Sequence, residues 1–439
     1  MCRRTPINAT ESKSLPYLTL TEPDLRGRVI DLPASKSISN RALMLNALSG
    51  NECQLQRLAI CDDTHSMQAA LCSESSCKDI GAAGTAMRFL TAYYAARPAQ
   101  QAVVLTGSER MKHRPIALVV NALRQMGAEI DYLEAEGYPP LRIQGKNLQG
   151  GEIHIDGSVS SQYLSALLMV APLCAQGLRM HIEGKLNSRP YIEMTLSMMK
   201  TFGVEAEALW QDNTITVPAQ RYCSPKTYVV EKDWSAASYW FEMVALSDDA
   251  QVLLKDVQAN SIQGDARVLD LFEDLGVRAE FLPDGLLLRS ASLQSDTPQT
   301  EMPQTHEMPL FEADLSQQPD LAQTFAVTCA LQYRPFALHG LESLRIKETD
   351  RMAALMNELK KLGYVLQCEG DSLYWRGERS EPQEPISIAT YEDHRMAMAF
   401  APAVLTWQGK YPIRIEHPAV VSKSYPDFFA QFLDGKTII

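Results

Sequence analysis

The sequence lacks the features of a membrane protein and of a disulfide scaffold. No stretch reaches about 18 consecutive uncharged apolar residues, and Met1 to Leu20 mix charge and proline before any apolar run. The nine cysteines are scattered, odd in number and without a C-x-x-C pair. We therefore expect a cytoplasmic protein with no membrane partner, whose thiols are reduced and mostly buried.

Signals for metal and nucleic acid are also missing. No cluster of His and Cys has the spacing of metal ligands. With 41 basic and 53 acidic residues the formal net charge is −12, which argues against nucleic acid as the main partner. A locally positive cleft is compatible with this total, because Lys and Arg recur in short clusters beside Gly, Ser and Thr.

The composition is that of an ordinary folded chain. Apolar residues make up 46% of the 439 residues and charged residues 21%, and low-complexity tails are absent. This length allows two or three domains, each large enough for its own core.

A strand, a polar turn, an amphipathic helix ending at glycine and a β-hairpin recur four times. The helices are predicted to end at Gly127, Gly203, Gly276 and Gly363, spaced 76, 73 and 87 residues apart. A left-handed glycine followed by a strand of period two explains each case. The strands before the helices are predicted at 103–107, 181–184, 252–256 and 336–340.

Polar turns precede the four helices and are predicted to be helix starts. They lie at 113–116, 188–191, 262–265 and 347–351, and Pro115 and Pro190 suit a first helical turn. A further unit is expected at 53–71, with its turn at 62–64. Helix starts that converge would present free N–H groups and positive dipole ends to an anion.

Eight segments carry residues suited to binding or catalysis. They are 32–41, 79–88, 110–115, 156–162, 318–321, 345–351, 393–396 and 422–427. Each also has an ordinary structural explanation, such as a helix N-cap, close helix packing at Gly81 and Gly84, a solvated turn, or, within 345–351, an i,i+4 pair of a cation and a carboxylate on a solvated helix. Together they supply at least five cations, a hydroxyl cradle and two candidate carboxylates for proton transfer.

In this order, and over nearly the whole chain, these segments resemble the 5-enolpyruvylshikimate-3-phosphate synthase family of enolpyruvyl transferases. The resemblance is carried by Ser35–Ser37, Ala83–Arg88, Arg114–Pro115, Ser160–Gln162, Lys347–Arg351, Asp393–Arg395 and Lys423. It implies an α/β fold of two similar domains, each built from three βαβαββ modules in an inside-out α/β barrel. One domain would comprise residues 1–34 and 234–439 and the other 35–233, with the active site in the cleft between them.

The resemblance also implies the reaction. The enolpyruvyl group of phosphoenolpyruvate would pass to the 5-hydroxyl of shikimate 3-phosphate, releasing phosphate, on the shikimate pathway to chorismate and the aromatic amino acids. Residues expected to bind shikimate 3-phosphate are Lys36, Ser37, Arg41, Ser160, Ser161, Gln162, Ser188, Tyr191, Asp320, Ser343 and Lys347. Residues expected to bind phosphoenolpyruvate are Lys36, Gly84, Arg114, Gln162, Arg351, His394, Arg395 and Lys423.

Three residues would carry the addition and elimination chemistry. By the resemblance Asp320 is the base for the attacking hydroxyl, Glu348 carries the proton to C3 of the enol, and Lys36 either stabilises charge on the departing phosphate or shuttles a proton. We expect no metal, no organic cofactor and a monomer.

The chain departs from the family pattern at four positions, which leaves binding constants and the response to glyphosate open. These are Ala34, Ala82, Phe89 and Ser343, in place of Gly, Asn, Pro and Asn. Two other readings are a UDP-N-acetylglucosamine enolpyruvyl transferase and a non-catalytic anion-binding protein. No Cys lies near Arg114, which argues against the first, and the carboxylates Asp320 and Glu348 argue against the second.

Overall fold

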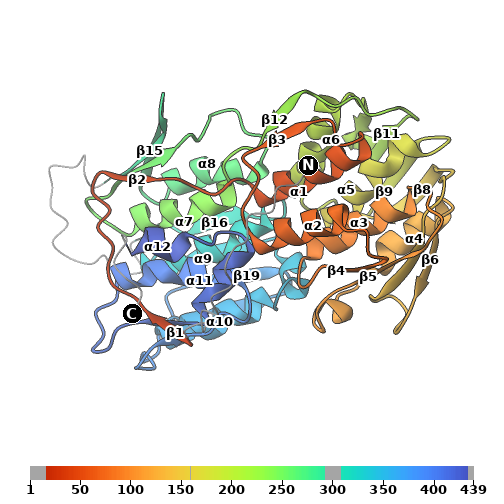
Figure 1. Ribbon diagram of the computed structural model, residues 1–439. Coiled ribbons are helices and arrows are strands. Elements are labelled where there is room, and N and C mark those ends of the chain that lie inside the picture. Colours follow the sequence, from red (N-terminus) through yellow and green to blue (C-terminus); the bar gives the residue numbers. More distant parts are fainter. Residues whose placement is uncertain (1–15, 159, 292–307, 434–439) are drawn as a thin grey trace.

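The computed structural model describes residues 16–158, 160–291 and 308–433. Residues 1–15 of the domain segment predicted at 1–34 therefore lie outside the described residues. Figure 1 shows two lobes side by side, one carrying α1 to α6 and the other α7 to α12. Their buried apolar side chains form two separate clusters. One cluster draws on residues 18–32 and 234–433, here the terminal lobe, and the other on residues 34–230, here the inserted lobe.

Four sheets repeat one βαβαββ topology, in which the first two strands are parallel and the rest antiparallel. The first consists of β4 (Cys77–Asp79), α3 (Gly84–Ala95), β5 (Val103–Thr106), α4 (Ala117–Gln125), β6 (Glu129–Tyr132) and β7 (Leu141–Gln144). The second consists of β8 (Gly151–Asp156), α5 (Ser161–Val170), β9 (Leu178–Glu183), α6 (Arg189–Thr201), β10 (Glu207–Leu209) and β11 (Thr214–Val217).

The terminal lobe contains the other two complete modules. The third consists of β2 (Arg28–Ile30), α7 (Trp234–Ala245), β13 (Gln251–Lys255), α8 (Val268–Glu273), β14 (Val277–Leu282) and β15 (Gly285–Ser290). The fourth consists of β16 (Phe311–Asp314), α9 (Ala322–Leu331), β17 (Phe336–His339), α10 (Arg351–Lys361), β18 (Gln367–Glu369) and β19 (Ser372–Trp375). Because β2 pairs with β13, the inserted lobe interrupts the third module.

Two shorter sheets complete the lobes. In the inserted lobe β3 (Gln54–Gln56) pairs in parallel with β12 (Thr227–Val229), beside α1 (Lys36–Leu48) and α2 (Asp62–Cys72). In the terminal lobe β1 (Tyr17–Thr19), β21 (Arg414–Glu416) and β20 (Ser387–Ile388) form the sheet, with α11 (His394–Phe400) and α12 (Phe428–Phe432).

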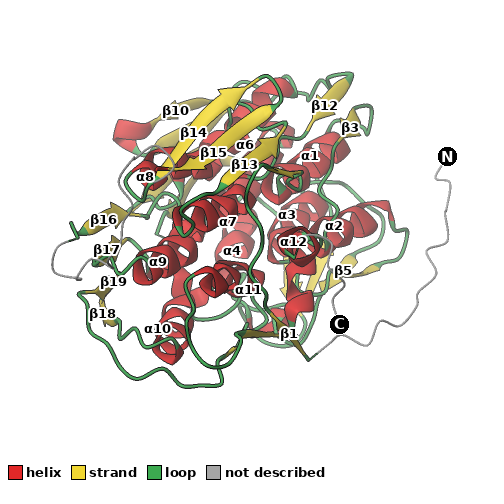
Figure 2. Cartoon of the chain, turned by 90° about the vertical axis from the view of Figure 1, so that its left-hand side faces the viewer, coloured by secondary structure: helices red, strands yellow, loops and turns green. Residues whose placement is uncertain are grey.

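Helices form the interior of each lobe and sheets its outside. All residues of α9 are buried, and so are those of α5 except Gln162, whereas β14 exposes all but its first residue. Figure 2 shows the sheets of the terminal lobe arranged around α7, α9 and α11. The predicted α/β fold class is confirmed. The division at 34/35 and 233/234 stays a prediction, which the two separate cores support.

Several local predictions are confirmed. All four helix-ending glycines have positive φ, between 81° and 97°, the conformation that a helix C-terminus of this kind requires. The four predicted strands are present as β5, β9, β13 and β17. Pro190 is in the first turn of α6. Among the described residues no helix is both long and apolar enough to cross a membrane.

Three local predictions are wrong. Pro115 precedes the N-cap Ile116, outside the first turn of α4. The segment 347–350 is not helical, because Asp350 caps α10 and the helix begins at Arg351. Only half of the eight thiols within the described ranges are buried, since Cys72, Cys77 and Cys223 are exposed and Cys368 is partly exposed.

Candidate active site

A cavity lies between the two lobes. The inserted lobe contributes Lys36, Ser37, Asp63, Gly84, Thr85, Arg88, Arg114, Pro115, Ser160, Gln162 and Tyr163 to its lining. The terminal lobe contributes Asp320, Ser343, Ile346, Lys347, Glu348, Arg351, His394 and Arg395. Residues more than 300 positions apart in the sequence therefore line the same cavity.

Helix starts point at this cavity, as the repeat predicts. Lys36, Gly84, Arg351 and His394 are the first residues of α1, α3, α10 and α11, and Ser160 is the N-cap of α5. A helix start leaves backbone N–H groups without partners within the helix and carries a positive dipole end. The fold thus adds anion-binding groups to those of the side chains.

The lining is rich in cations. Six of its side chains are basic and three are carboxylates. The basic ones are Lys36, Arg88, Arg114, Lys347, Arg351 and Arg395, and the carboxylates are Asp63, Asp320 and Glu348. A chain with a net charge of −12 has concentrated positive charge in its cleft, which suits ligands with several negative groups.

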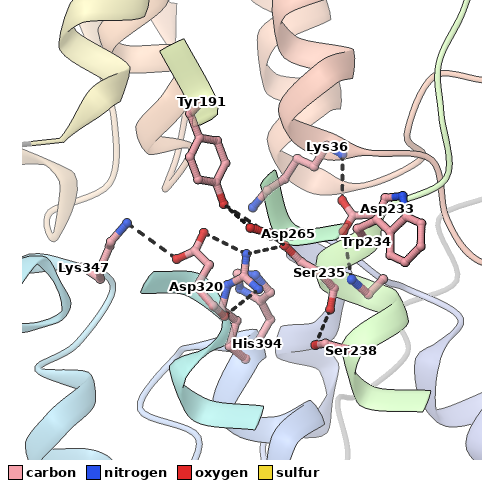
Figure 3. A network of polar contacts seen from close by, with 12 residues as sticks. Lys36, Tyr191, Asp233, Trp234, Ser235, Ser238, Asp265, Asp320, Lys347 and His394 are labelled. Atoms are coloured by element: carbon pink, nitrogen blue, oxygen red, sulfur yellow. Dashed lines mark hydrogen bonds and ion pairs between the residues drawn. The ribbon is translucent and has the colours of Figure 1, made fainter. Parts of the chain in front are cut away.

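Asp320 lies at the centre of the polar network drawn in Figure 3. Its Oδ1 is 2.9 Å from Nη1 of Arg351 and 3.6 Å from Nζ of Lys347, and its Oδ2 is 3.0 Å from Nη2 of Arg395. Burial alone would raise the pKa of Asp320, but Arg395, Lys347 and Arg351 outweigh burial and hold it well below its usual range. Asp320 is therefore ionised, and it is not the helix cap that its sequence position suggests.

Arg351 is held by three carboxylates. Besides Asp320, its Nη2 lies 2.9 Å from Oε2 of Glu348 and its Nε lies 2.7 Å from Oδ2 of Asp393. Burial would raise the pKa of Glu348, but the charges of Arg351, Arg114 and Lys36 hold it well below its ordinary value. Both carboxylates expected to take part in proton transfer are thus charged and tied to the same arginine.

Lys36 contacts two carboxylates. Its Nζ lies 3.0 Å from Oδ2 of Asp63, and its backbone N–H donates to Oδ2 of Asp233 over 3.2 Å (Figure 3). Burial disfavours the ammonium, but the charges of Asp63 and Glu348 raise its pKa above the ordinary value. Lys36 is therefore a fixed cation in the wall of the cavity.

His394 is buried beside these cations. Burial, together with Lys36 and Arg395, holds its pKa well below the usual value, so the ring is neutral. Neither ring nitrogen has a hydrogen-bond partner among the described residues. A neutral imidazole aimed at the cavity can donate one hydrogen bond to a ligand.

Five predicted site residues do not line the cavity. They are Arg41, Ser161, Ser188, Tyr191 and Lys423. Ser161 is buried in the first turn of α5, Nζ of Lys423 lies 3.4 Å from the carbonyl oxygen of Glu392, and Ser188 caps α6 with a φ of 58°.

Arg41 lies one layer behind the wall. Its Nη1 donates to the carbonyl oxygen of Ser37 over 3.1 Å, and its Nε donates to Oγ1 of Thr195 over 2.7 Å. The guanidinium covers the ring of Phe89 at 5.3 Å, so the unusual Phe89 serves as its packing surface. Burial lowers the pKa of Arg41 to about 10. In this structure Arg41 positions Ser37.

Tyr191 connects the lobes and does not border the cavity. Its hydroxyl donates to Oδ1 of Asp265 over 3.0 Å, and Ser235 donates to the other oxygen of the same carboxylate (Figure 3). Burial and the charge of Asp320 raise the pKa of Asp265 to about 6.

Sequence reasoning missed four acidic or basic residues at or beside the site. They are Asp63, Arg88, Asp265 and Asp393. All four lie in turns or segments that the sequence singles out. Only their equivalent positions in successive modules could have indicated a role for them. Ala82 is exposed and does not line the cavity.

The family model for EPSP synthase (3-phosphoshikimate 1-carboxyvinyltransferase) matches residues 21–73 and 69–432. The chain belongs to the EPSP synthase family. The predicted membership and the predicted enzyme class, a transferase, are thereby confirmed.

Curated relatives agree with this membership. A 3-phosphoshikimate 1-carboxyvinyltransferase of Bacteroides fragilis is 49% identical over 414 residues, covering 93% of this chain and 95% of the relative. One of Edwardsiella ictaluri is 39% identical over 429 residues, covering 92% and 95%. The solved EPSP synthase of Acinetobacter baumannii has a TM-score of 0.70 at 21% identity over 94% of this chain and 96% of that one, which supports the fold.

Proposed function

We propose that the cavity between the lobes is the active site in which the enolpyruvyl group of phosphoenolpyruvate passes to the 5-hydroxyl of shikimate 3-phosphate. The observation that carries this proposal is the set of six cations around one cavity in a member of the EPSP synthase family. The two substrates bring two phosphates and two carboxylates into contact. Only an excess of fixed positive charge offsets their mutual repulsion.

Phosphoenolpyruvate binds between the lobes, against Arg114 on one side and Arg351 and Arg395 on the other. Burial and the neighbouring charge of Arg88 lower the pKa of Arg114, which marks it as a guanidinium short of negative partners. An incoming phosphate or carboxylate supplies that partner. His394, Gln162 and the helix start at Gly84 complete the pocket, and Lys423 joins it only after a movement.

Shikimate 3-phosphate binds on Ser37, Ser160, Ser343 and Lys347, with Lys36 shared between the two substrates. Hydroxyl groups both donate and accept, so they suit a polyol and a phosphate alike. Burial lowers the pKa of Lys347, although the charge of Asp320 works in the other direction. A bound phosphate would stabilise the ammonium form. Arg41 supports this surface through the Ser37 carbonyl.

Substrate binding frees the catalytic base. In the present arrangement Arg351, Arg395 and Lys347 neutralise Asp320. When the anionic groups of phosphoenolpyruvate take over the two arginines, the pKa of Asp320 rises, and it can accept the proton of the attacking hydroxyl.

The remaining proton steps fall to two residues. When the anionic groups of phosphoenolpyruvate take over Arg351 and Arg114, the pKa of Glu348 rises and it takes up a proton from solvent. Glu348 delivers this proton to C3 of the enol and takes one back from C3 on elimination, while Lys36 stabilises the negative charge of the leaving phosphate. No step requires a metal or an organic cofactor. Closure of the lobes keeps water away from the tetrahedral intermediate.

The chain acts as a monomer in the cytoplasm, with domains 1–34 plus 234–439 and 35–233. Each lobe has its own apolar core, which supports this division.

Release of inorganic phosphate from phosphoenolpyruvate tests the proposal. We expect release with shikimate 3-phosphate and none with UDP-N-acetylglucosamine. Arg114→Met should lower kcat/KM for phosphoenolpyruvate about 10- to 100-fold, the value of a hydrogen bond to a charged group. Arg179→Met, at an exposed position of β9, is the control and should change little. Release only with the nucleotide sugar, or no release at all, contradicts the proposal.

A further inference from the structure

The outer face of the sheet that contains β8 and β9 carries two stacked histidines. His154 of β8 lies directly opposite His181 of β9, with ring centroids 4.9 Å apart and ring planes at 21°. Glu152 lies two residues before His154, on the same face of β8. One ligand atom from each of Glu152, His154 and His181 lies within 4.8 Å of the other two. None of the three lines the cavity between the lobes.

The hydrogen bonds around both rings assign their protons. Thr214 donates its hydroxyl proton to the carbonyl oxygen of Asp212 over 3.0 Å, so its oxygen accepts from Nδ1 of His181 over 3.1 Å. Nδ1 of His154 donates to Oε1 of Glu183 over 3.1 Å. In the neutral form of each ring, Nε2 is therefore the nitrogen with the free lone pair. A second group that holds the far nitrogen of a ring is the usual support of a metal-binding histidine.

The contact between His181 and Glu152 calls for a positive charge. Nε2 of His181 lies 2.6 Å from Oε1 of Glu152. A lone pair facing a carboxylate at this distance is repulsive, so either a proton or a cation must lie between them. Two imidazole nitrogens and one carboxylate oxygen are the donor set that Zn²⁺ and its first-row neighbours prefer.

We propose that Glu152, His154 and His181 form a surface site for one divalent transition metal ion of the Zn²⁺ class, with Thr214 and Glu183 holding the two rings. Metal bonds of about 2.0–2.2 Å need ligand atoms closer together than 4.8 Å. The side chains of Glu152, His154 and Glu183 are 60%, 61% and 67% exposed, so Glu152 can rotate and His154 can turn together with Glu183 to close the difference. The site is structural: the ion bridges two strands and takes no part in enolpyruvyl transfer.

Titration of the full chain with Zn²⁺ at neutral pH, followed by calorimetry and by thermal unfolding, tests this site. We expect one ion per chain and a melting temperature that rises with Zn²⁺, because a ligand of the folded state alone stabilises it. His154→Gln and His181→Gln should each lower the affinity at least about tenfold. Thr214→Val should lower it about 10- to 100-fold, as the loss of a ring-supporting group does.

His339→Gln is the matched control. His339 pairs with Glu312 at 3.1 Å on the neighbouring strands β17 and β16, but within the described residues it belongs to no group of three candidate ligands. Cu²⁺ as a probe adds a spectroscopic signature, nitrogen couplings from two imidazoles in electron paramagnetic resonance. Absence of saturable binding, binding that survives both His154→Gln and His181→Gln, or an equal loss in His339→Gln overturns the proposal and leaves a protonated His181 as the partner of Glu152.

Discussion

Arg351 and Asp393 form a two-pronged ion pair inside the terminal lobe. Nε of Arg351 lies 2.7 Å from Oδ2 of Asp393 and its Nη2 lies 3.3 Å from Oδ1, with the two side chains 2% and 0% exposed. Oδ1 also accepts the backbone N–H of Arg395 over 2.9 Å, as the N-cap of α11. One carboxylate thus orients Arg351 and anchors the helix that carries Arg395.

Asp393→Asn should therefore damage stability and substrate binding together. Breaking a buried pair leaves the charge of Arg351 without its best partner, which costs about 3–5 kcal/mol. We expect the free energy of unfolding in urea to fall by that amount and KM for phosphoenolpyruvate to rise. Asp350→Asn is the control, because Asp350 is only partly buried and caps α10, and Asn caps equally well. Wild-type stability in Asp393→Asn would show that the pair contributes nothing.

Asp320→Ala should separate binding from turnover. We expect shikimate 3-phosphate to bind nearly as in the wild type in calorimetry, since its phosphate is held by other residues. Turnover should fall at least about a hundredfold, the usual contribution of a general base. Asp270→Ala, at an exposed position of α8, controls for the substitution itself. Unchanged turnover would remove Asp320 from the role of base.

The repeat could be predicted from the sequence because its signals are local. A helix that ends at a left-handed glycine needs only the few residues around it, and Gly127, Gly203, Gly276 and Gly363 all meet that requirement. Equivalent helix starts then bring distant cations together, which is why Lys36, Arg114 and Arg351 meet at one cavity. The charges of the site were thus predictable from the motifs.

The partners of those charges were not predictable in the same way. The pairs Lys36 with Asp63 and Arg351 with Asp393 join residues that are 27 and 42 positions apart, and no local pattern specifies such a contact. The segment before Arg351 was expected to be helical because Lys347 and Arg351 are four residues apart. The competing cap at Asp350 delays the helix, so that Lys347 reaches Asp320 from an irregular turn.

Gly84→Ala should weaken phosphoenolpyruvate binding selectively. A Cβ at this position would lie 2.7 Å from Nη1 of Arg114 and 2.9 Å from Nη1 of Arg88. Both guanidiniums are ends of flexible side chains, so the fold survives but the two groups must move. A misplacement of about 1 Å can cost about a hundredfold in rate, so kcat/KM for phosphoenolpyruvate should fall about 10- to 100-fold. Steady-state kinetics should find KM for shikimate 3-phosphate less affected, and an equal rise in both constants would contradict this account.

Asp265 should make the protein less stable as pH rises through the weakly acidic range. Burial, reinforced by the charge of Asp320, raises its pKa from the ordinary 3.8 to about 6. Between these two values the folded chain holds a proton that the unfolded chain has released, so the free energy of unfolding falls as pH rises. The contribution is fully favourable below about pH 4 and fully lost above about pH 6, and its size is on the order of 3 kcal/mol.

Asp265→Asn isolates this effect, because the amide is neutral at every pH and keeps one oxygen to accept from Tyr191 or Ser235. The quantity to measure is the difference in free energy of unfolding between Asp265→Asn and the wild type, since the other carboxylates cancel in it. The free energy of unfolding of Asp265→Asn should rise relative to that of the wild type from about pH 4 to about pH 6, and the difference should stay constant above that range. A difference that does not change with pH would mean that Asp265 is ionised throughout, and that the hydroxyls of Tyr191 and Ser235 stabilise its charge more than burial and Asp320 oppose it.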